Sequence, residues 1–210
     1  LGLYGDKDSG TISVLRPVYG GSAVAKFEFS ENTTNLAIMR VKAIEALPED
    51  KERSGDIETV QLTLDKSRVK TKLVETVVQE AEGIKLEDAS VIIGGGRGLG
   101  GPEPFDQLEE LAKVFNGAVG ASRAVCDAGW LDHAYQIGLT GKTVTPDLYI
   151  MIGISGASQH MAGCSASKNI VAINKDGDAN IFKEAQYGVI GDWEKVLPSF
   201  TATVTELMKS

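Results

Sequence analysis

The chain has 210 residues, a formal net charge of −8 and a hydrophobic fraction of 42% against a charged fraction of 24%. These averages are typical of a folded globular protein and exclude a disordered, fibrous or membrane-embedded chain. The lack of a lysine and arginine cluster argues against a nucleic-acid partner. The two cysteines, Cys126 and Cys164, belong to no metal-binding or disulfide pattern. We therefore expect a reducing compartment and no metal site.

The N-terminal part of the chain is predicted to be rich in strands. Apolar and charged residues alternate over residues 25–29, and residues 35–41 form a further apolar run. Both patterns are typical of strands. The polar, charge-rich residues 48–56 then indicate a linker. Because Leu1 is not an initiator methionine and no signal peptide opens the chain, we expect it to be a processed or truncated end.

Two elements are predicted after the linker. Residues 59–64 have the composition of one more strand. Apolar residues then recur at helical spacing over residues 69–81, and Gly83 follows as a C-cap. This pattern predicts a helix that connects the linker to the rest of the chain.

The C-terminal part of the chain alternates between apolar runs and amphipathic helical patterns. Runs of continuous apolar residues are buried on both faces, which is typical of a parallel sheet covered by helices. The strands are expected over residues 90–93, 118–121, 148–152, 170–173 and 189–190, and the helices around residues 105–115 and 200–208. Residues 148–167 are uncharged but too rich in polar residues and glycine to span a membrane, so we expect no membrane insertion.

Glycine is concentrated at the predicted strand ends, where a doubly wound sheet binds its ligands. Of the 24 glycines, 14 lie between Gly94 and Gly163. Gly96–Gly101 satisfies the GxGxxG dinucleotide pattern, which is a weak signal, and a simple tight turn is the alternative. The next strand ends in Ser122 and Arg123 rather than in the acidic residue that holds the ribose of NAD. These side chains favour pyrophosphate oxygens, or a 2′-phosphate, as ligand.

Two other glycine-containing loops resemble catalytic motifs but lack a required residue. Gly141-Lys142-Thr143 ends like a P-loop, yet Gln136 stands where the first glycine belongs. Residues 153–157 approach a nucleophile elbow, yet they end in alanine, and His160 follows on the same segment. We therefore expect no catalytic residue.

A set of hydrogen-bond donors remains on the predicted strand-end loops. A long ligand that is anionic in its middle and polar along a ring edge, as FAD is, would use such donors. Individually the members have plainer interpretations, since a loop arginine is more often a surface residue. His133, outside the set, is expected to be an exposed structural residue. The set comprises Arg97, Ser122, Arg123, Thr140, Ser155, Gln159 and His160.

The same loops resemble the α subunit of electron-transfer flavoproteins. The matching runs are Ala121–Ala124, Asp127–Trp130, Gln136–Lys142, Leu148–Ile150, Gly153–His160, Ala172–Asp176 and Tyr187–Asp192. The resemblance covers residues 91–198, and Arg16–Gly21 resembles the end of that family's first domain. It implies three parts: the C-terminal part of a first α/β domain over residues 1–48, a linker and connecting helix over 49–86, and an FAD-binding domain over 87–210.

The resemblance implies a non-covalently bound FAD in a doubly wound, flavodoxin-like domain. Arg97 and Ser122 would lie along the pyrophosphate and Arg123 against the isoalloxazine ring. A loop at the ring would consist of Gln136, Ile137, Gly138, Leu139 and Thr140, with Leu139 in place of the family's usual glutamine. A loop that follows the pyrophosphate and ribityl chain to the flavin O2 would consist of Ser155, Gly156, Ala157, Ser158, Gln159 and His160. Asn174, Asp192 and Trp193 would hold the adenosine end.

The resemblance also implies an electron carrier without substrate chemistry of its own, paired with a β subunit that completes the flavin site. Its donors would be flavin dehydrogenases, such as the acyl-CoA dehydrogenases of fatty acid oxidation, and its acceptor a quinone oxidoreductase or respiratory chain. Such a protein is expected in the cytoplasm, or in the mitochondrial matrix of a eukaryote. Two alternatives remain: a bifurcating subunit that takes electrons from NADH, and a non-redox nucleotide-binding module.

Overall fold

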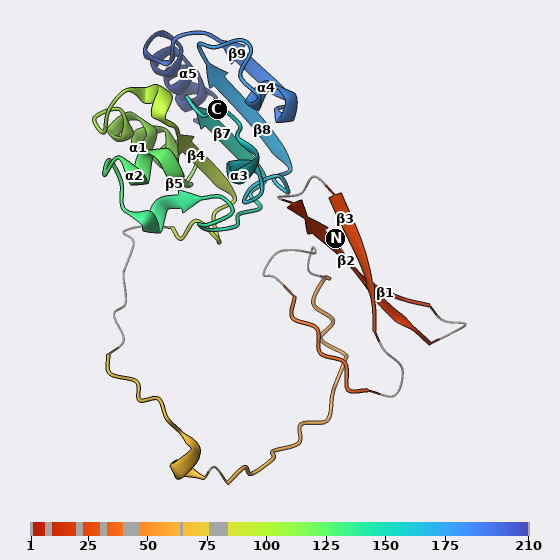
Figure 1. Ribbon diagram of the computed structural model, residues 1–210. Coiled ribbons are helices and arrows are strands. Elements are labelled where there is room, and N and C mark those ends of the chain that lie inside the picture. Colours follow the sequence, from red (N-terminus) through yellow and green to blue (C-terminus); the bar gives the residue numbers. More distant parts are fainter. Residues whose placement is uncertain are drawn as a thin grey trace. The chain divides into compact units, whose positions relative to one another are not determined.

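The computed structural model describes residues 2–6, 10–19, 23–29, 33–39, 47–63, 65–75 and 84–209. Three parts are described separately below: a small antiparallel sheet, the segment 47–75, and an α/β domain that begins near residue 84 (Figure 1).

The N-terminal part forms a three-stranded antiparallel sheet, as its alternating pattern predicts. Its strands are β1 (Gly2–Gly5), β2 (Ile12–Val18) and β3 (Ala23–Glu28), in the order β1-β2-β3. Val14 lies opposite Phe27, and the guanidinium of Arg16 lies 5.2 Å from the centre of the Phe27 ring. The strand expected over 35–41 is absent from residues 35–39, and residues 40–41 lie outside the described residues.

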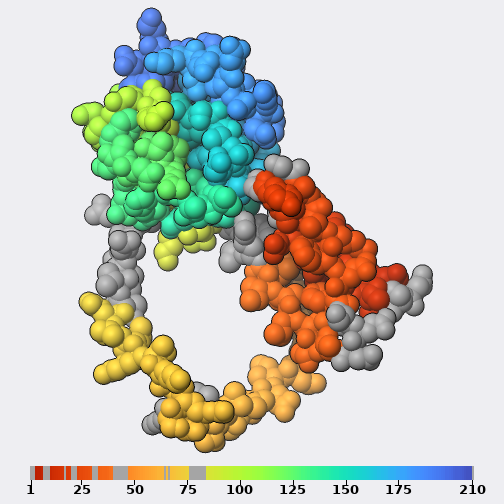
Figure 2. All heavy atoms as spheres, viewed as in Figure 1, coloured from red at the N-terminus to blue at the C-terminus, as the bar shows by residue number. Residues whose placement is uncertain are grey.

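The segment 47–75 has almost no regular structure. Its described residues contain one 3-10 turn, η2 (Lys66–Arg68), and no strand over 59–63, where one is predicted. Residues 69–75 are not helical, and residues 76–83 lie outside the described residues. Val69, Leu73 and Val74 are exposed, so the described part of the predicted apolar face is not buried. A short helix whose apolar face is not buried is marginal in water. Figure 2 shows the open course of residues 65–75 in yellow.

The α/β domain contains a six-stranded sheet in which every pair of neighbouring strands is parallel. The strands are β4 (Val91–Gly95), β5 (Ala118–Ser122), β6 (Gln136–Ile137), β7 (Leu148–Ile152), β8 (Asn169–Asn174) and β9 (Tyr187–Ile190). Their order is β6-β5-β4-β7-β8-β9. The chain starts at the centre, moves outward to β6, returns beside β4 and moves outward again to β9. The predicted doubly wound α/β class is confirmed.

The order of the strands agrees with the predicted flavodoxin-like sheet. Numbered along the domain without the two-residue β6, the strands β5-β4-β7-β8-β9 run 2-1-3-4-5, the order of flavodoxin-like folds. The short β6 is added beside β5 at the edge, and counted with it the order is 3-2-1-4-5-6, that of dinucleotide-binding folds. Both orders place a ligand crevice where the direction of winding reverses.

Helices cover both faces of this sheet (Figure 1). On one face lie α1 (Phe105–Val114), α2 (Arg123–Asp127) and α5 (Trp193–Leu207), and on the other lie α3 (Ser158–Met161) and α4 (Ile181–Glu184). Successive strand residues point to opposite faces, so Ile92 packs with the α3 and α4 side and Ile93 with the α1, α2 and α5 side. Burial on both faces explains the continuous apolar runs of the central strands.

Candidate functional site

A cavity of about 990 Å³ lies at the carboxyl edge of the six-stranded sheet. Loops that follow five of the strands line it: β4, β5, β6, β7 and β8. The reversal of winding between β4 and β7 opens this edge, because the loops after these two strands run to opposite sides. The volume is at the upper end of the range of ligand pockets.

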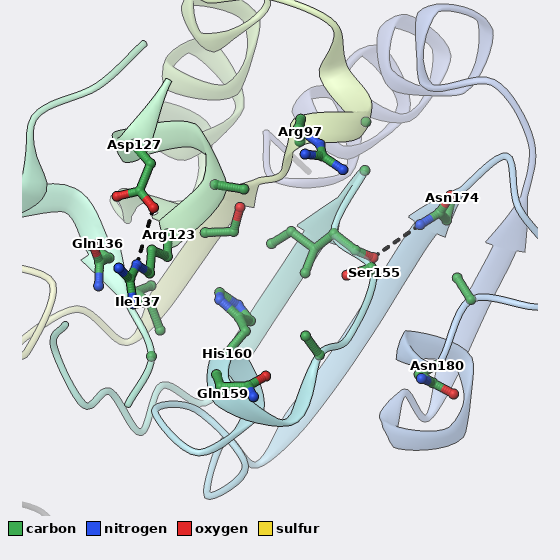
Figure 3. Close-up of a pocket in the computed structure, with 18 of the residues that line it drawn as sticks. Arg97, Arg123, Asp127, Gln136, Ile137, Ser155, Gln159, His160, Asn174 and Asn180 are labelled. Carbon is green, nitrogen blue, oxygen red and sulfur yellow. Dashed lines mark hydrogen bonds and ion pairs between the residues drawn. The ribbon is translucent and has the colours of Figure 1, made fainter. Parts of the chain in front are cut away.

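Backbone hydrogen bonds lock the two loops at the reversal point together. Gly96 N donates to Ile152 O at 2.9 Å, and Gly98 N donates to Gly153 O at 3.0 Å. A Cβ on Gly96 would collide with the Gly153 carbonyl group, so this position admits only glycine. The GxGxxG pattern therefore serves close packing between two loops, and Arg97 projects from it into the cavity (Figure 3).

Arg123 begins α2 and lines the cavity from the β5 side. Its Nε donates to Asp127 Oδ2 at 3.1 Å, and both side chains are more than half exposed. Such an exposed ion pair contributes little stability, about 0–1 kcal/mol. The ion pair with Asp127 therefore holds Arg123 at the rim of the cavity. Because this pair contributes so little free energy, an anionic ligand can replace Asp127 as the partner of Arg123.

The loop after β6 is folded back on itself and joined to the α3 segment. Gln136 is buried, and its Nε2 donates to Thr140 Oγ1 at 3.0 Å. Leu139 N donates to Gln159 O at 2.7 Å, while the Leu139 side chain is 60% exposed. Lys142 forms a 2.9 Å ion pair with Glu87, which fixes the end of the loop to the segment before β4.

His160 lines the cavity from α3, and the residue is 6% exposed. Its Nε2 forms a 3.2 Å hydrogen bond with the Tyr149 hydroxyl, whereas Nδ1 is buried and makes no hydrogen bond. Burial lowers the pKa of His160 to about 4, and a weak hydrogen-bonding contact with the Ile137 backbone, which does not reach the geometry of a full hydrogen bond, offsets only part of that shift. In the ligand-free protein the imidazole is therefore neutral at pH 7, and a neutral ring acts through hydrogen bonds.

Asn174 and its neighbours form the β8 side of the cavity. Asn174 Nδ2 donates to Ile154 O at 3.0 Å, and its Oδ1 accepts from Asp176 N at 3.0 Å. The side chain thus ties the β7 loop to the β8 loop. Asp178 and Asn180 line the cavity beyond it (Figure 3 labels Asn180).

Comparison with known proteins identifies this domain. Residues 85–165 match the electron transfer flavoprotein FAD-binding domain family. The chain is 47% identical to the electron transfer flavoprotein subunit alpha of Bacillus subtilis over 94% of its own length and 60% of that protein. It is 44% identical to the Megasphaera elsdenii subunit alpha, over 95% of its own length and 60% of that protein. It is 37% identical to the mitochondrial subunit alpha of Arabidopsis thaliana, over 94% of its own length and 56% of that protein.

The chain belongs to the electron transfer flavoprotein α-subunit family. It spans about 60% of the length of the bacterial relatives. No helix among the described residues is long and apolar enough to cross a membrane, and these residues contain no cluster of metal-binding side chains.

Most of the residues predicted to bind a cofactor in this α-subunit chain come together around the cavity. They are Arg97, Ser122, Arg123, Gln136, Ile137, Gly138, Leu139, Thr140, Ser155, Ala157, Gln159, His160 and Asn174. Four predicted residues do not line it. Gly156 and Ser158 lie within the β7 to α3 loop, Asp192 caps α5 by accepting from Glu194 N at 3.2 Å, and Trp193 packs on the α1, α2 and α5 face. The contact of Gly156 and Ser158 with the pyrophosphate and ribityl chain, and that of Asp192 and Trp193 with the adenosine end, remains a prediction.

The structure also adds residues that the sequence did not single out as ligands. The acidic side chains Asp127, Asp176 and Asp178 line the cavity together with Asn180. Asp127 is part of the Asp-Ala-Gly run by which the chain resembles this family, so a signal for it was present. Asp176 ends the matching run Ala172–Asp176, so a signal was present for it as well. Asp178 and Asn180 lie further along the loop after β8, and no sequence pattern separates them from ordinary loop residues.

Proposed function

We propose that this cavity binds FAD and that the chain is the FAD-binding α subunit of an electron carrier. One observation carries the proposal: two arginines and a buried imidazole, from separate strand-end loops, surround a single cavity of about 990 Å³. The unpartnered Nδ1 of His160 supports it, since a buried polar atom without a hydrogen bond is unfavourable unless a ligand satisfies it.

Residues that line the cavity are suited to the pyrophosphate, the isoalloxazine ring and a ribose of FAD. Arg97 and Ser122 are suited to the pyrophosphate, because a guanidinium makes charge-assisted hydrogen bonds to phosphate oxygens. Arg123 and the loop 136–140 would hold the isoalloxazine ring. The carboxylate of Asp176 would accept hydrogen bonds from ribose hydroxyls. When bound, the flavin supplies electron transfer in one-electron or two-electron steps, which these side chains cannot supply.

We further propose that a β subunit completes the site. The rim residues Arg123 and Leu139 are exposed, so the described residues leave the ring end of the cavity open to solvent. Electrons would enter from flavin dehydrogenases such as acyl-CoA dehydrogenases and leave to a quinone-linked acceptor or a respiratory chain. An open ring end supports this role, because a carrier must bring its flavin close to those of its partners.

The test is to co-express the chain with an electron-transfer flavoprotein β subunit and to purify the complex. A flavin absorption spectrum, release of FAD on denaturation, and reduction by an acyl-CoA dehydrogenase with its substrate are expected. Reduction by NADH instead would identify a bifurcating carrier. A complex that contains neither bound flavin nor affinity for added FAD would refute the proposal and favour the non-redox module.

Replacement of Arg97 is expected to weaken FAD retention. Loss of a charge-assisted hydrogen bond costs about 1.5–3 kcal/mol, so Arg97→Gln should raise the dissociation constant of FAD by roughly ten-fold to a hundred-fold. Fluorescence titration of the flavin-stripped complex measures this constant. Arg68→Gln, on η2 outside the α/β domain, is the control and should bind FAD as the wild type does.

Replacement of His160 by leucine is expected to lower the first one-electron reduction potential of the bound flavin. A donor near the flavin O2 favours the negative charge that reduction places there. Loss of a hydrogen bond to a charged group, about 1.5–3 kcal/mol, corresponds to a decrease of roughly 60–130 mV for one electron. Spectroelectrochemical titration measures it. His160→Gln keeps a donor and should retain most of the potential, whereas an unchanged potential in His160→Leu would exclude the role.

A further inference from the structure

Tyr149 lies behind His160, away from the cavity lining, and its side chain is completely buried on β7. Its hydroxyl is 3.2 Å from His160 Nε2, and the two ring centres are 6.1 Å apart. Because Tyr149 belongs to a central strand, it is fixed by the sheet itself. It therefore offers a rigid attachment for an imidazole that sits on the short helix α3.

The neighbouring strand makes room for this tyrosine. A Cβ on Gly94 of β4 would lie 2.5 Å from the Tyr149 hydroxyl oxygen and 2.9 Å from its Cζ. Any larger residue at Gly94 would displace the Tyr149 ring and hydroxyl from their present positions. The contact between Tyr149 and His160 thus depends on a glycine in the adjacent strand as well as on the two residues themselves.

The direction of the hydrogen bond follows from the number of protons. A tyrosine hydroxyl has one proton to donate, and His160 is the hydrogen-bond partner that the structure gives it. If Nε2 carried the imidazole proton, the buried tyrosine proton would have no acceptor there, which is unfavourable. If the hydroxyl donates to Nε2 instead, the neutral ring carries its proton on Nδ1.

The titration behaviour of both groups is consistent with this arrangement. Burial lowers the pKa of His160 to about 4 and raises the pKa of Tyr149 well above its ordinary value, with Cys164 adding to the second shift. The imidazole is therefore neutral and the phenol protonated across the neutral pH range. A neutral imidazole has two tautomers, and the hydrogen bond at one nitrogen decides which of them is present.

We propose that Tyr149 is a positioning residue that fixes His160 in the tautomer with its proton on Nδ1, so that the ring offers a donor to a ligand in the cavity. The inference rests on the proposed function, because the flavin would supply the acceptor for that donor. Nδ1 is the nitrogen that the protein leaves without a hydrogen bond. Tyr149 on β7 thus determines that His160 presents a hydrogen-bond donor to the cavity, although Tyr149 itself does not line the cavity.

The test reads the tautomer directly. The purified complex, with this chain labelled with ¹⁵N-histidine, is studied by NMR both with FAD and after FAD is stripped, and the ring signals are assigned with His160→Gln. We expect the Nδ1–H tautomer to predominate in the wild type and a mixture of tautomers in Tyr149→Phe. In the loaded complex, Tyr149→Phe should also lower the first reduction potential of the flavin, and should not lower it further when His160 is already leucine.

The control is Tyr187→Phe, which removes a hydroxyl from an exposed tyrosine on β9 and should change neither readout. A predominant Nε2–H tautomer in the wild type, or an unchanged tautomer in a folded Tyr149→Phe complex, would overturn the role of Tyr149 even if FAD binds. Conversely, a complex that cannot bind FAD but shows the expected tautomers would refute the proposed function and leave the role of Tyr149 in place.

Discussion

Acidification from pH 7 to pH 5 is expected to destabilise the flavin-free protein by about 2 kcal/mol through His160 alone. The ordinary pKa of 6.5 applies to the unfolded chain, whereas burial lowers the pKa in the folded protein to about 4. Between these values the unfolded state binds a proton that the folded state does not bind. The stability contributed by the neutral ring is therefore fully present above pH 6.5, and roughly 3 kcal/mol is lost as the pH falls to 4.

Urea unfolding at pH 7, 6 and 5 measures this dependence. His160→Gln should show a smaller loss of unfolding free energy between pH 7 and pH 5 than the wild type, whatever its stability at pH 7. Carboxylates that titrate in this range do so in both proteins, so the difference isolates His160. Parallel curves for wild type and His160→Gln would show that the buried ring is not the cause.

The parallel sheet could be predicted from the sequence because its central strands are buried on both faces. Residues 148–152 form a continuous apolar run, and the strand β7 has these bounds. The two-residue strand β6 could not be predicted, because a pattern needs several residues to show a period. The spacing of apolar residues and the glycine at position 83 predict a helix over 69–81, but its described part, 69–75, is not helical. Helical spacing of apolar residues indicates an apolar face, but it does not show whether another element packs against that face.

The part of the candidate site that could be predicted consists of residues placed by the topology of the sheet. Arg97, Arg123 and Ser155 follow separate strands, and strand ends of a parallel sheet share one edge, so their meeting around the cavity follows from topology. Asp178 and Tyr149 could not be found in this way. Asp178 reaches the cavity through the irregular course of the β8 loop, and Tyr149 looks like one more apolar residue of a buried strand. Only the coordinates reveal that its hydroxyl meets His160.

Gly156→Ala is expected to destabilise the α/β domain by roughly 2–5 kcal/mol, from backbone strain and overpacking together. Gly156 has φ +78°, which is unfavourable for alanine, and an added Cβ would collide with the backbone of Ile181 and lie 2.9 Å from the Asn180 carbonyl carbon. Ile181 is completely buried at the start of α4, and its N donates to Ser155 O at 3.0 Å. Neither backbone can move without breaking this link between the β7 loop and α4.

Gly129→Ala separates the two causes of that destabilisation. Gly129 has φ +73°, close to that of Gly156, but no atom lies within 4 Å of an added Cβ. The strain of a positive φ alone costs about 1–2 kcal/mol, so Gly129→Ala should fall in that range. Urea unfolding of both variants measures the difference. Equal losses of unfolding free energy would mean that the β7 loop and α4 move apart easily. A larger loss in Gly156→Ala, together with weaker FAD retention, would mean that the close packing of this loop against α4 shapes the wall of the cavity.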